Sequence, residues 1–182
     1  MKRILIPSVI CLSIITGCST TNSVPYKAST SNIITIQQAL GKTGKKVSIG
    51  NIIAAKGINE SPVCRLMGPV NVAPGKTLSQ YIKDAFQEEL FLADVYSPNA
   101  PIKISGTITN LDFSSVSPAN WSISMSVKSS NLAAYSVSAK YPFNTSFDAY
   151  SACKNVANAF GPAVQTLIKK VVSHPQFTSL AR

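Results

Sequence analysis

The chain has 182 residues, with 17 Lys and Arg against 7 Asp and Glu, and so carries a formal net charge of +10. One histidine and seven scattered acidic residues, without the spacing of a metal-binding motif, argue against a metal site. The basic residues are dispersed and no zinc-finger or RNA-binding motif accompanies them, so we expect no nucleic acid as a partner.

The first residues have the pattern of an export signal. Lys2 and Arg3 precede the apolar run ILIPSVICLSII, which has the length of a signal and is short for a membrane span. The sequence ITGC follows and resembles a bacterial lipobox. This resemblance implies that residues 1–17 are a lipoprotein signal peptide cleaved between Gly17 and Cys18. It also implies a diacylglyceryl thioether on the Cys18 sulfur and an acyl group, such as palmitate, on its new amino group. The alternatives are an ordinary signal peptide with an incidental cysteine, or an uncleaved anchor.

The residue after this cysteine bears on the destination of the protein. Each buried acyl CH₂ contributes about 0.8 kcal/mol and one chain holds a protein only marginally, so two or three chains on Cys18 are needed for a stable anchor. Ser19 stands where an aspartate resembles an inner-membrane retention signal. By analogy with Gram-negative sorting, we expect a lipid anchor in the outer membrane, a domain facing the periplasm, and no cofactor apart from the covalent lipid.

Cleavage after residue 17 leaves 165 residues, enough for one domain with a proper core, and removes two basic residues, so the charge falls from +10 to +8. An excess of this kind favours solubility, or else attraction to anionic lipid headgroups, a polysaccharide or an acidic partner.

Two cysteines remain once the signal is removed and Cys18 is lipidated. In an oxidising periplasm, a disulfide between Cys64 and Cys153 is the natural use of such a pair. Two buried free thiols, or a catalytic thiol that meets the single histidine, His174, are the alternatives.

The early part of the chain predicts a tether and then a single domain. Residues 18–31 are too polar to fold alone and read as a flexible link, followed by a domain over residues 32–182. Residues 32–40 fit a short strand or a short helix equally well. The alternation in KKVSIGNIIAA predicts a strand over residues 45–55, with a possible bulge at Gly50 and Asn51.

The middle of the chain predicts a helix and a meander. Thr77 and Gln80 resemble a capping box, and the apolar spacing that follows predicts a helix over residues 78–93. Three strands are then expected, in residues 101–115, 120–129 and 134–144, with a bulge near Asn110 where the alternation changes parity.

The meander has one apolar face and one serine-rich face, which is typical of an antiparallel sheet wet on one side. Lys128 and Lys140 lie on the serine-rich face, so this is a possible binding face for an anionic ligand, although an ordinary soluble surface gives the same pattern. If it is not the site, the loop VCRLMGPVNVAPG around Arg65 is the next candidate.

A long helix is predicted at the C-terminal end. Thr145 or Ser146 is the expected cap, Tyr150 and Cys153 begin the buried stripe, and Pro162 is expected to kink the helix. Together the elements predict an α+β fold: an antiparallel sheet of about four strands with two helices packed on one face.

Several long segments resemble a family of small, largely uncharacterised outer-membrane lipoproteins of Gram-negative proteobacteria: VCRLMGPVNVAPGKTLSQYIKDAFQEELF, ISGTITNLDFSSVSPANWSISMSV and YSACKNVANAFGPAVQTLIKKVV. The resemblance covers most of the expected domain and implies an α/β lipoprotein fold. It implies no catalytic residues.

Sequence motifs give little support for an enzyme. The G-x-S-x-G pattern of serine hydrolases is absent, and the only adjacent carboxylates, Glu88 and Glu89, point apart on a helix. We therefore expect a non-enzymatic envelope lipoprotein that binds a protein partner or an anionic envelope polymer, with its oligomeric state open. The alternative is a surface-exposed lipoprotein that contacts a host or the environment.

Overall fold

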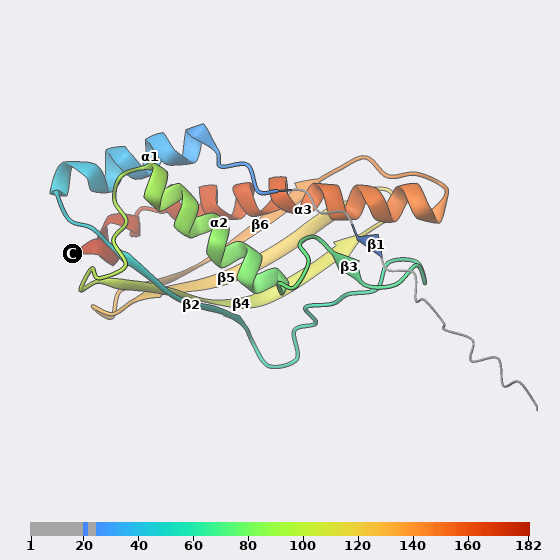
Figure 1. Ribbon diagram of the computed structural model, residues 1–182, viewed down its shortest axis with the longest axis horizontal. Coiled ribbons are helices and arrows are strands. Elements are labelled where there is room, and N and C mark those ends of the chain that lie inside the picture. Colours follow the sequence, from blue (N-terminus) through green and yellow to red (C-terminus); the bar gives the residue numbers. More distant parts are fainter. Residues whose placement is uncertain (1–19, 22–24) are drawn as a thin grey trace, which may run out of the picture.

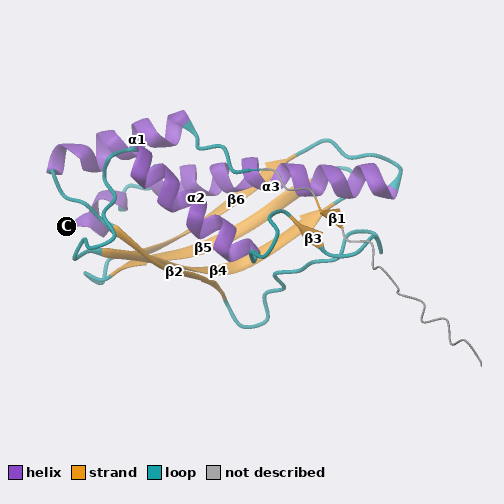
Figure 2. Cartoon of the chain, viewed as in Figure 1, coloured by secondary structure: helices purple, strands orange, loops and turns teal. Residues whose placement is uncertain are grey.

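A four-stranded sheet forms one layer of the molecule, and the helices pack on one face of it (Figures 1 and 2). The computed structural model describes residues 20–21 and 25–182, so the predicted signal peptide and the predicted lipidation site at Cys18 lie outside the described residues. The elements are β1 (Thr20–Thr21), α1 (Thr30–Leu40), η1 (Gly41–Thr43), β2 (Ser48–Ala54), β3 (Val70–Asn71), α2 (Leu78–Leu92), β4 (Lys103–Ser114), β5 (Asn120–Ser129), β6 (Ala134–Pro142), α3 (Ala149–Val172) and η2 (Phe177–Ala181).

The predicted α+β class is confirmed, with three α-helices among the described residues rather than the expected two. The strand order is β2-β4-β5-β6, and the meander of β4, β5 and β6 is antiparallel as expected. The remaining strand of this sheet, β2, differs from the expectation, because it pairs with β4 in parallel. The connection between them runs through α2, which returns the chain to the end of the sheet where β2 begins, and such a crossover yields parallel strands.

Both predicted bulges are present. The register between β4 and β5 shifts between Ile108 and Asn110, and the register between β2 and β4 shifts between Ile49 and Ile52. Each shift turns an alternating sequence so that apolar side chains on both sides of the bulge face the helices. In both strands, a change of parity in the apolar alternation therefore marks a β-bulge.

The start of α2 has the predicted capping box. The Thr77 hydroxyl accepts a hydrogen bond from the Gln80 amide at 3.2 Å, and the Gln80 side chain accepts one from the Thr77 amide at 2.9 Å. These bonds satisfy backbone donors that no helical carbonyl can reach, and they fix where the helix begins.

The start of α3 differs from the prediction. Asp148 caps this helix by accepting from the Ser151 amide at 2.7 Å, while Ser146 donates to the Asp148 carboxylate at 2.6 Å. Tyr150 is exposed rather than buried, because the first turn of α3 reaches beyond the ends of the strands (Figure 1). The helix then runs through Pro162 without interruption to Val172.

The domain begins earlier than residue 32. Residues 32–40, which fitted a strand or a helix, belong to helix α1, and its cap is Ser29. Before the cap, the Tyr26 side chain packs edge-on against Tyr81 of α2 with ring centroids 6.0 Å apart. The last part of the expected tether is thus attached to the fold.

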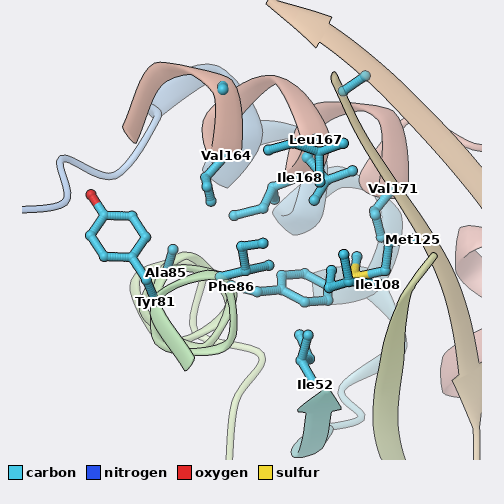
Figure 3. Packing of buried hydrophobic residues seen from close by; sticks show 14 of the residues in the cluster. Ile52, Tyr81, Ala85, Phe86, Ile108, Met125, Val164, Leu167, Ile168 and Val171 are labelled. Carbon is cyan, nitrogen blue, oxygen red and sulfur yellow. The ribbon is translucent and has the colours of Figure 1, made fainter. Parts of the chain in front are cut away.

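The core lies between the sheet and the helices. Trp121 of β5 is fully buried, packs edge-on against Phe160 of α3 with ring centroids 4.9 Å apart, and donates a 2.8 Å hydrogen bond to the Val156 carbonyl. Figure 3 shows side chains of the two long helices meeting those of the strands; the labelled residues include Ala85, Phe86, Leu167, Ile168, Ile52, Ile108 and Met125. Removing a large buried side chain from such a layer typically costs about 3 to 5 kcal/mol.

Candidate functional site

The outer face of the sheet carries the predicted binding residues, but they do not form one cluster. Lys128 and Lys140 are both exposed there. Lys140 lies opposite Ser122, which is six residues along β5 from Lys128, so the two lysines stand about 20 Å apart. A ligand smaller than this distance contacts one of them at a time.

Each lysine has a different electrostatic neighbourhood. Ser122 lies between Lys140 and Asp112 in the cross-strand row, so Lys140 has an acidic residue two strands away. Lys128 lies opposite Ser105, and Lys103 is its diagonal neighbour at a Cα distance of about 7 to 8 Å. Neither ion pair of the described residues involves Lys103 or Lys128. The positive end of the face is therefore the Lys103–Lys128 end.

A shallow depression lies beside these two lysines and is lined by Gly50, Asn51, Ser105 and Thr107 among others. Gly50 allows the close approach of β2 to β4, because a Cβ at this position would collide with the Ser105 hydroxyl and lie 3.0 Å from Lys103 Cγ. The lining is mainly polar, with Ile53 as its one large apolar residue, and it includes both Lys103 and Lys128, which suits an anionic ligand. The sequence alone indicated Lys128 as a binding residue, whereas Lys103 could be recognised as its neighbour only from the register between β4 and β5.

Arg65, the alternative candidate, is committed to internal hydrogen bonds. Its guanidinium donates to the Ser115 carbonyl at 2.5 Å and hydroxyl at 3.0 Å, and to the carbonyls of Ser146 and Phe147 at 3.1 and 3.0 Å. These acceptors belong to the β4–β5 and β6–α3 loops. Arg65 thus ties three loops together and has a structural role in this state of the protein.

The two remaining cysteines form the expected disulfide. Cys64 and Cys153 are joined across 89 positions, with their Cα atoms 5.7 Å apart, so the loop before β3 is linked covalently to α3. Both are buried. This pairing removes the thiols on which a cysteine nucleophile would depend.

The single histidine lies in a packed position. The His174 ring stacks on Tyr135 with centroids 4.1 Å apart and planes 4° apart, and its Nδ1 accepts a 3.2 Å hydrogen bond from the Gln176 amide. The Tyr135 hydroxyl donates to the Val171 carbonyl at 2.9 Å. Within residues 20–21 and 25–182, no group of three or more His, Cys, Asp or Glu side chains could hold a metal ion.

A buried carboxylate is the main polar feature that sequence reasoning missed. Glu89 is 0% exposed on the inner side of α2, and its Oε1 accepts hydrogen bonds from the Tyr26 hydroxyl at 2.6 Å and the Ser29 amide at 3.0 Å. Asn32 donates to the same oxygen at 3.3 Å and to the Gln165 carbonyl at 3.0 Å. Glu89 therefore joins the chain before α1 to α2, and Asn32 extends the network to α3.

Burial raises the pKa of the Glu89 carboxyl, and the hydrogen bonds from Tyr26, Ser29 and Asn32 oppose this shift by favouring the carboxylate. Burial also raises the pKa of the Tyr26 hydroxyl, and the nearby Glu89 adds to that shift. Glu89 Oε2 has no hydrogen-bond partner. A helical spacing of three and four residues from Ala85 and Phe86 was the signal that could have placed Glu89 on the buried stripe.

Comparison with known proteins adds to the description of the fold. No family model matches the chain, and a search of curated proteins finds no match. Among solved structures, protein XCC0632 from Xanthomonas campestris, which carries the family label DUF330, is similar with a TM-score of 0.52. It is 15% identical, over 74% of this chain and 85% of that one. A "putative lipoprotein" from Caulobacter crescentus has a TM-score of 0.44 and 12% identity, over 80% of this chain and 92% of that one. The first likeness shows a shared fold.

None of the helices in the described part of the chain has the length and apolar character needed to cross a membrane.

Proposed function

We propose that this chain is a lipid-anchored, non-enzymatic lipoprotein of the outer membrane, held on the periplasmic side, and that its sheet binds an anionic polymer of the envelope. The pattern around Cys18 supports the anchor, and Ser19 supports the outer membrane. An acidic partner protein is the other ligand with the same charge chemistry.

One observation carries the binding proposal. Lys103 and Lys128 are diagonal neighbours on the face of the sheet opposite the helices, both line a mainly polar depression, and no described acidic side chain pairs with either of them. Two neighbouring ammonium groups repel each other, and an anion bound between or above them offsets this repulsion, so an anionic ligand is favoured at this end of the face.

The experiment compares two pairs of charge reversals with equal change in net charge. In Lys103→Glu with Lys128→Glu, we expect binding to a polyanion probe, dextran sulfate, to fall at least tenfold. Lys169→Glu with Lys170→Glu, on the exposed last turn of α3, is the matched control and should bind within twofold of the unaltered chain. Binding should also weaken with salt, because the Debye length is about 10 Å at 0.1 M. Equal loss in both pairs would mean that net charge, and not this face, attracts the polymer.

The anchor and the orientation have their own tests. The mass of the mature protein from membranes should correspond to residues 18–182 plus the lipid. Protease treatment of intact cells should leave the protein uncut, whereas digestion would support surface exposure. If this chain does not bind dextran sulfate but captures a protein through Lys103 and Lys128, the ligand is an acidic partner protein.

A further inference from the structure

Exposed apolar side chains gather at one end of the molecule, on the loops that Arg65 ties together and on the first turn of α3. We call them the apolar tip: Val63, Leu66, Val116, Phe147 and Tyr150. Leu66 is 98% exposed and Phe147 is fully exposed, and Val116 and Phe147 line one hollow together with Arg65. Clustered large apolar side chains on a soluble surface mark a contact with a protein or a membrane.

The tip is held rigidly in this exposed arrangement. Both neighbours of Leu66 in the sequence are held in place. The Arg65 guanidinium donates hydrogen bonds to the other two loops, and the Met67 amide donates one to the Cys64 carbonyl at 2.7 Å. Arg65 and Leu66 have φ angles of 42° and 61°, a region that is unfavourable for residues with a Cβ. The disulfide at Cys64 fixes the base of the same loop. Leu66 is therefore presented to the surroundings by its own scaffold.

The path of the chain toward Cys18 leads to this end. The strands β1 and β3 pair in parallel, with Thr20 opposite Val70, so the chain enters β1 from the side where the Leu66 loop enters β3. The Val70 amide also donates a 2.9 Å hydrogen bond to the Pro62 carbonyl, which closes that loop. Cys18 precedes Thr20 by two residues, and two residues span at most about 7 Å.

The position of Pro25 and Tyr26 also places the chain that leads to Cys18 near β3, independently of β1. Pro25 and Tyr26 line a hollow with Val72 and Ala73, which directly follow β3. Pro25 is seven positions after Cys18, so even an extended link spans at most about 25 Å. A lipid on Cys18 is thus confined to the neighbourhood of the tip.

We propose that the apolar tip inserts into the interface of the membrane that holds the anchor, as a second contact beside the lipid on Cys18. This inference rests on the proposed anchor for its cellular setting. Aliphatic side chains and a tyrosine suit the boundary between headgroups and acyl chains, where an apolar ring and a polar hydroxyl are both satisfied. Two contacts fix the orientation of the domain, whereas one lipid leaves it free to rotate.

The chain provides a matched probe position. Leu132, in the β5–β6 turn at the opposite end of the sheet, is 92% exposed and has a φ of 74°, so it resembles Leu66 in residue type, exposure and backbone. Leu66→Trp and Leu132→Trp are therefore compared in the mature chain, each with the buried Trp121 as the common background. The chain is coupled through the Cys18 thiol to a maleimide phospholipid in vesicles of phosphatidylethanolamine and phosphatidylglycerol with brominated acyl chains.

We expect the brominated lipids to quench at least half of the added fluorescence in Leu66→Trp and to leave that of Leu132→Trp unchanged. If brominated lipids quench Leu66→Trp no more than Leu132→Trp, the proposal is overturned. The chemical coupling supplies the anchor, so this result does not depend on whether cells lipidate Cys18. The mass of the native protein tests that point separately.

A second pair of variants checks that the tip itself causes the insertion. A Tyr150→Trp probe should lose its quenching when Leu66→Asp and Phe147→Asp are added, since charged side chains oppose entry into the interface. The same probe should keep its quenching when Leu132→Asp is added instead. Retention of quenching in both cases would contradict the role of Leu66 and Phe147.

Discussion

The Tyr26 hydroxyl donates a 2.6 Å hydrogen bond to Glu89, and this contact fastens the chain before α1 to the buried side of α2. Glu89 has no basic partner within the described ion pairs; burial and the neighbouring Glu88 raise the pKa of its carboxyl, and the three hydrogen-bond donors oppose that shift. This part of the fold is consequently sensitive to pH.

Glu89→Gln should change how stability depends on pH. The pKa of Glu89 is raised above its ordinary value of 4.5 in the folded protein, so the folded state binds this proton more tightly than the unfolded state. The Glu89 contribution is therefore fully present below about pH 4.5 and is lost as the pH rises through the raised pKa. Denaturant unfolding followed by Trp121 fluorescence should show the unaltered chain losing stability over this window relative to Glu89→Gln. Parallel curves would show that Glu89 has the same pKa in both states.

Tyr26→Phe should weaken the attachment of α1. The substitution removes a donor to a buried carboxylate, and such bonds contribute about 1.5 to 3 kcal/mol. Amide hydrogen exchange in α1 should accelerate more than exchange in β5. Tyr150→Phe is the matched control, since Tyr150 is exposed, and it should leave exchange in α1 unchanged. Equal behaviour of the two variants would contradict the anchoring role of Tyr26.

Cys64→Ser with Cys153→Ser should lower the free energy of unfolding by about 2 to 5 kcal/mol. A link across 89 positions restricts the unfolded chain, and the chain-entropy estimate for such a loop is about 4 to 5 kcal/mol. Denaturant titration measures the loss. In the unaltered protein, alkylation of the denatured chain should find both cysteines only after reduction; two reactive thiols without reductant would rule out the link.

Arg65→Lys should destabilise the protein although it keeps the charge. A lysine has no planar fork and cannot reach the Ser115 and Phe147 carbonyls together, so we expect a loss of about 1 to 2 kcal/mol and faster exchange in the two loops. Lys154→Arg, an exposed substitution on α3, should stay within about 0.5 kcal/mol. If Arg65→Lys also changed the free energy of unfolding by no more than about 0.5 kcal/mol, Arg65 would be free to act as a binding residue, as the sequence had suggested.

Local signals in the sequence were sufficient for much of the fold. The capping box at Thr77, the bulge near Asn110 and the alternation of β5 and β6 depend on residues a few positions apart, so a linear pattern contains them. The disulfide followed from the number of cysteines and the expected oxidising compartment. The outer face of the sheet was expected for the same local reason.

Relationships between distant segments were not accessible in this way. The parallel pairing of β2 depends on the path through α2, and Arg65 reaches the carbonyls of Ser146 and Phe147 from about 80 positions away. Glu89 is buried only because Tyr26, Ser29 and Asn32 supply donors more than 50 positions distant. Lys103 becomes a neighbour of Lys128 through strand register alone.

The position of α3 after all four strands of the main sheet has a consequence for biogenesis. The apolar faces of β5 and β6 pack against this helix, and Trp121 finds its hydrogen-bond acceptor only at Val156. A chain that emerges from a ribosome or a translocation channel in N-to-C order therefore exposes a finished meander with an uncovered apolar face until residues 149–182 arrive. Chaperones that guard nascent or exported chains would act chiefly on this interval, and truncation before α3 would give an aggregating fragment rather than a smaller domain.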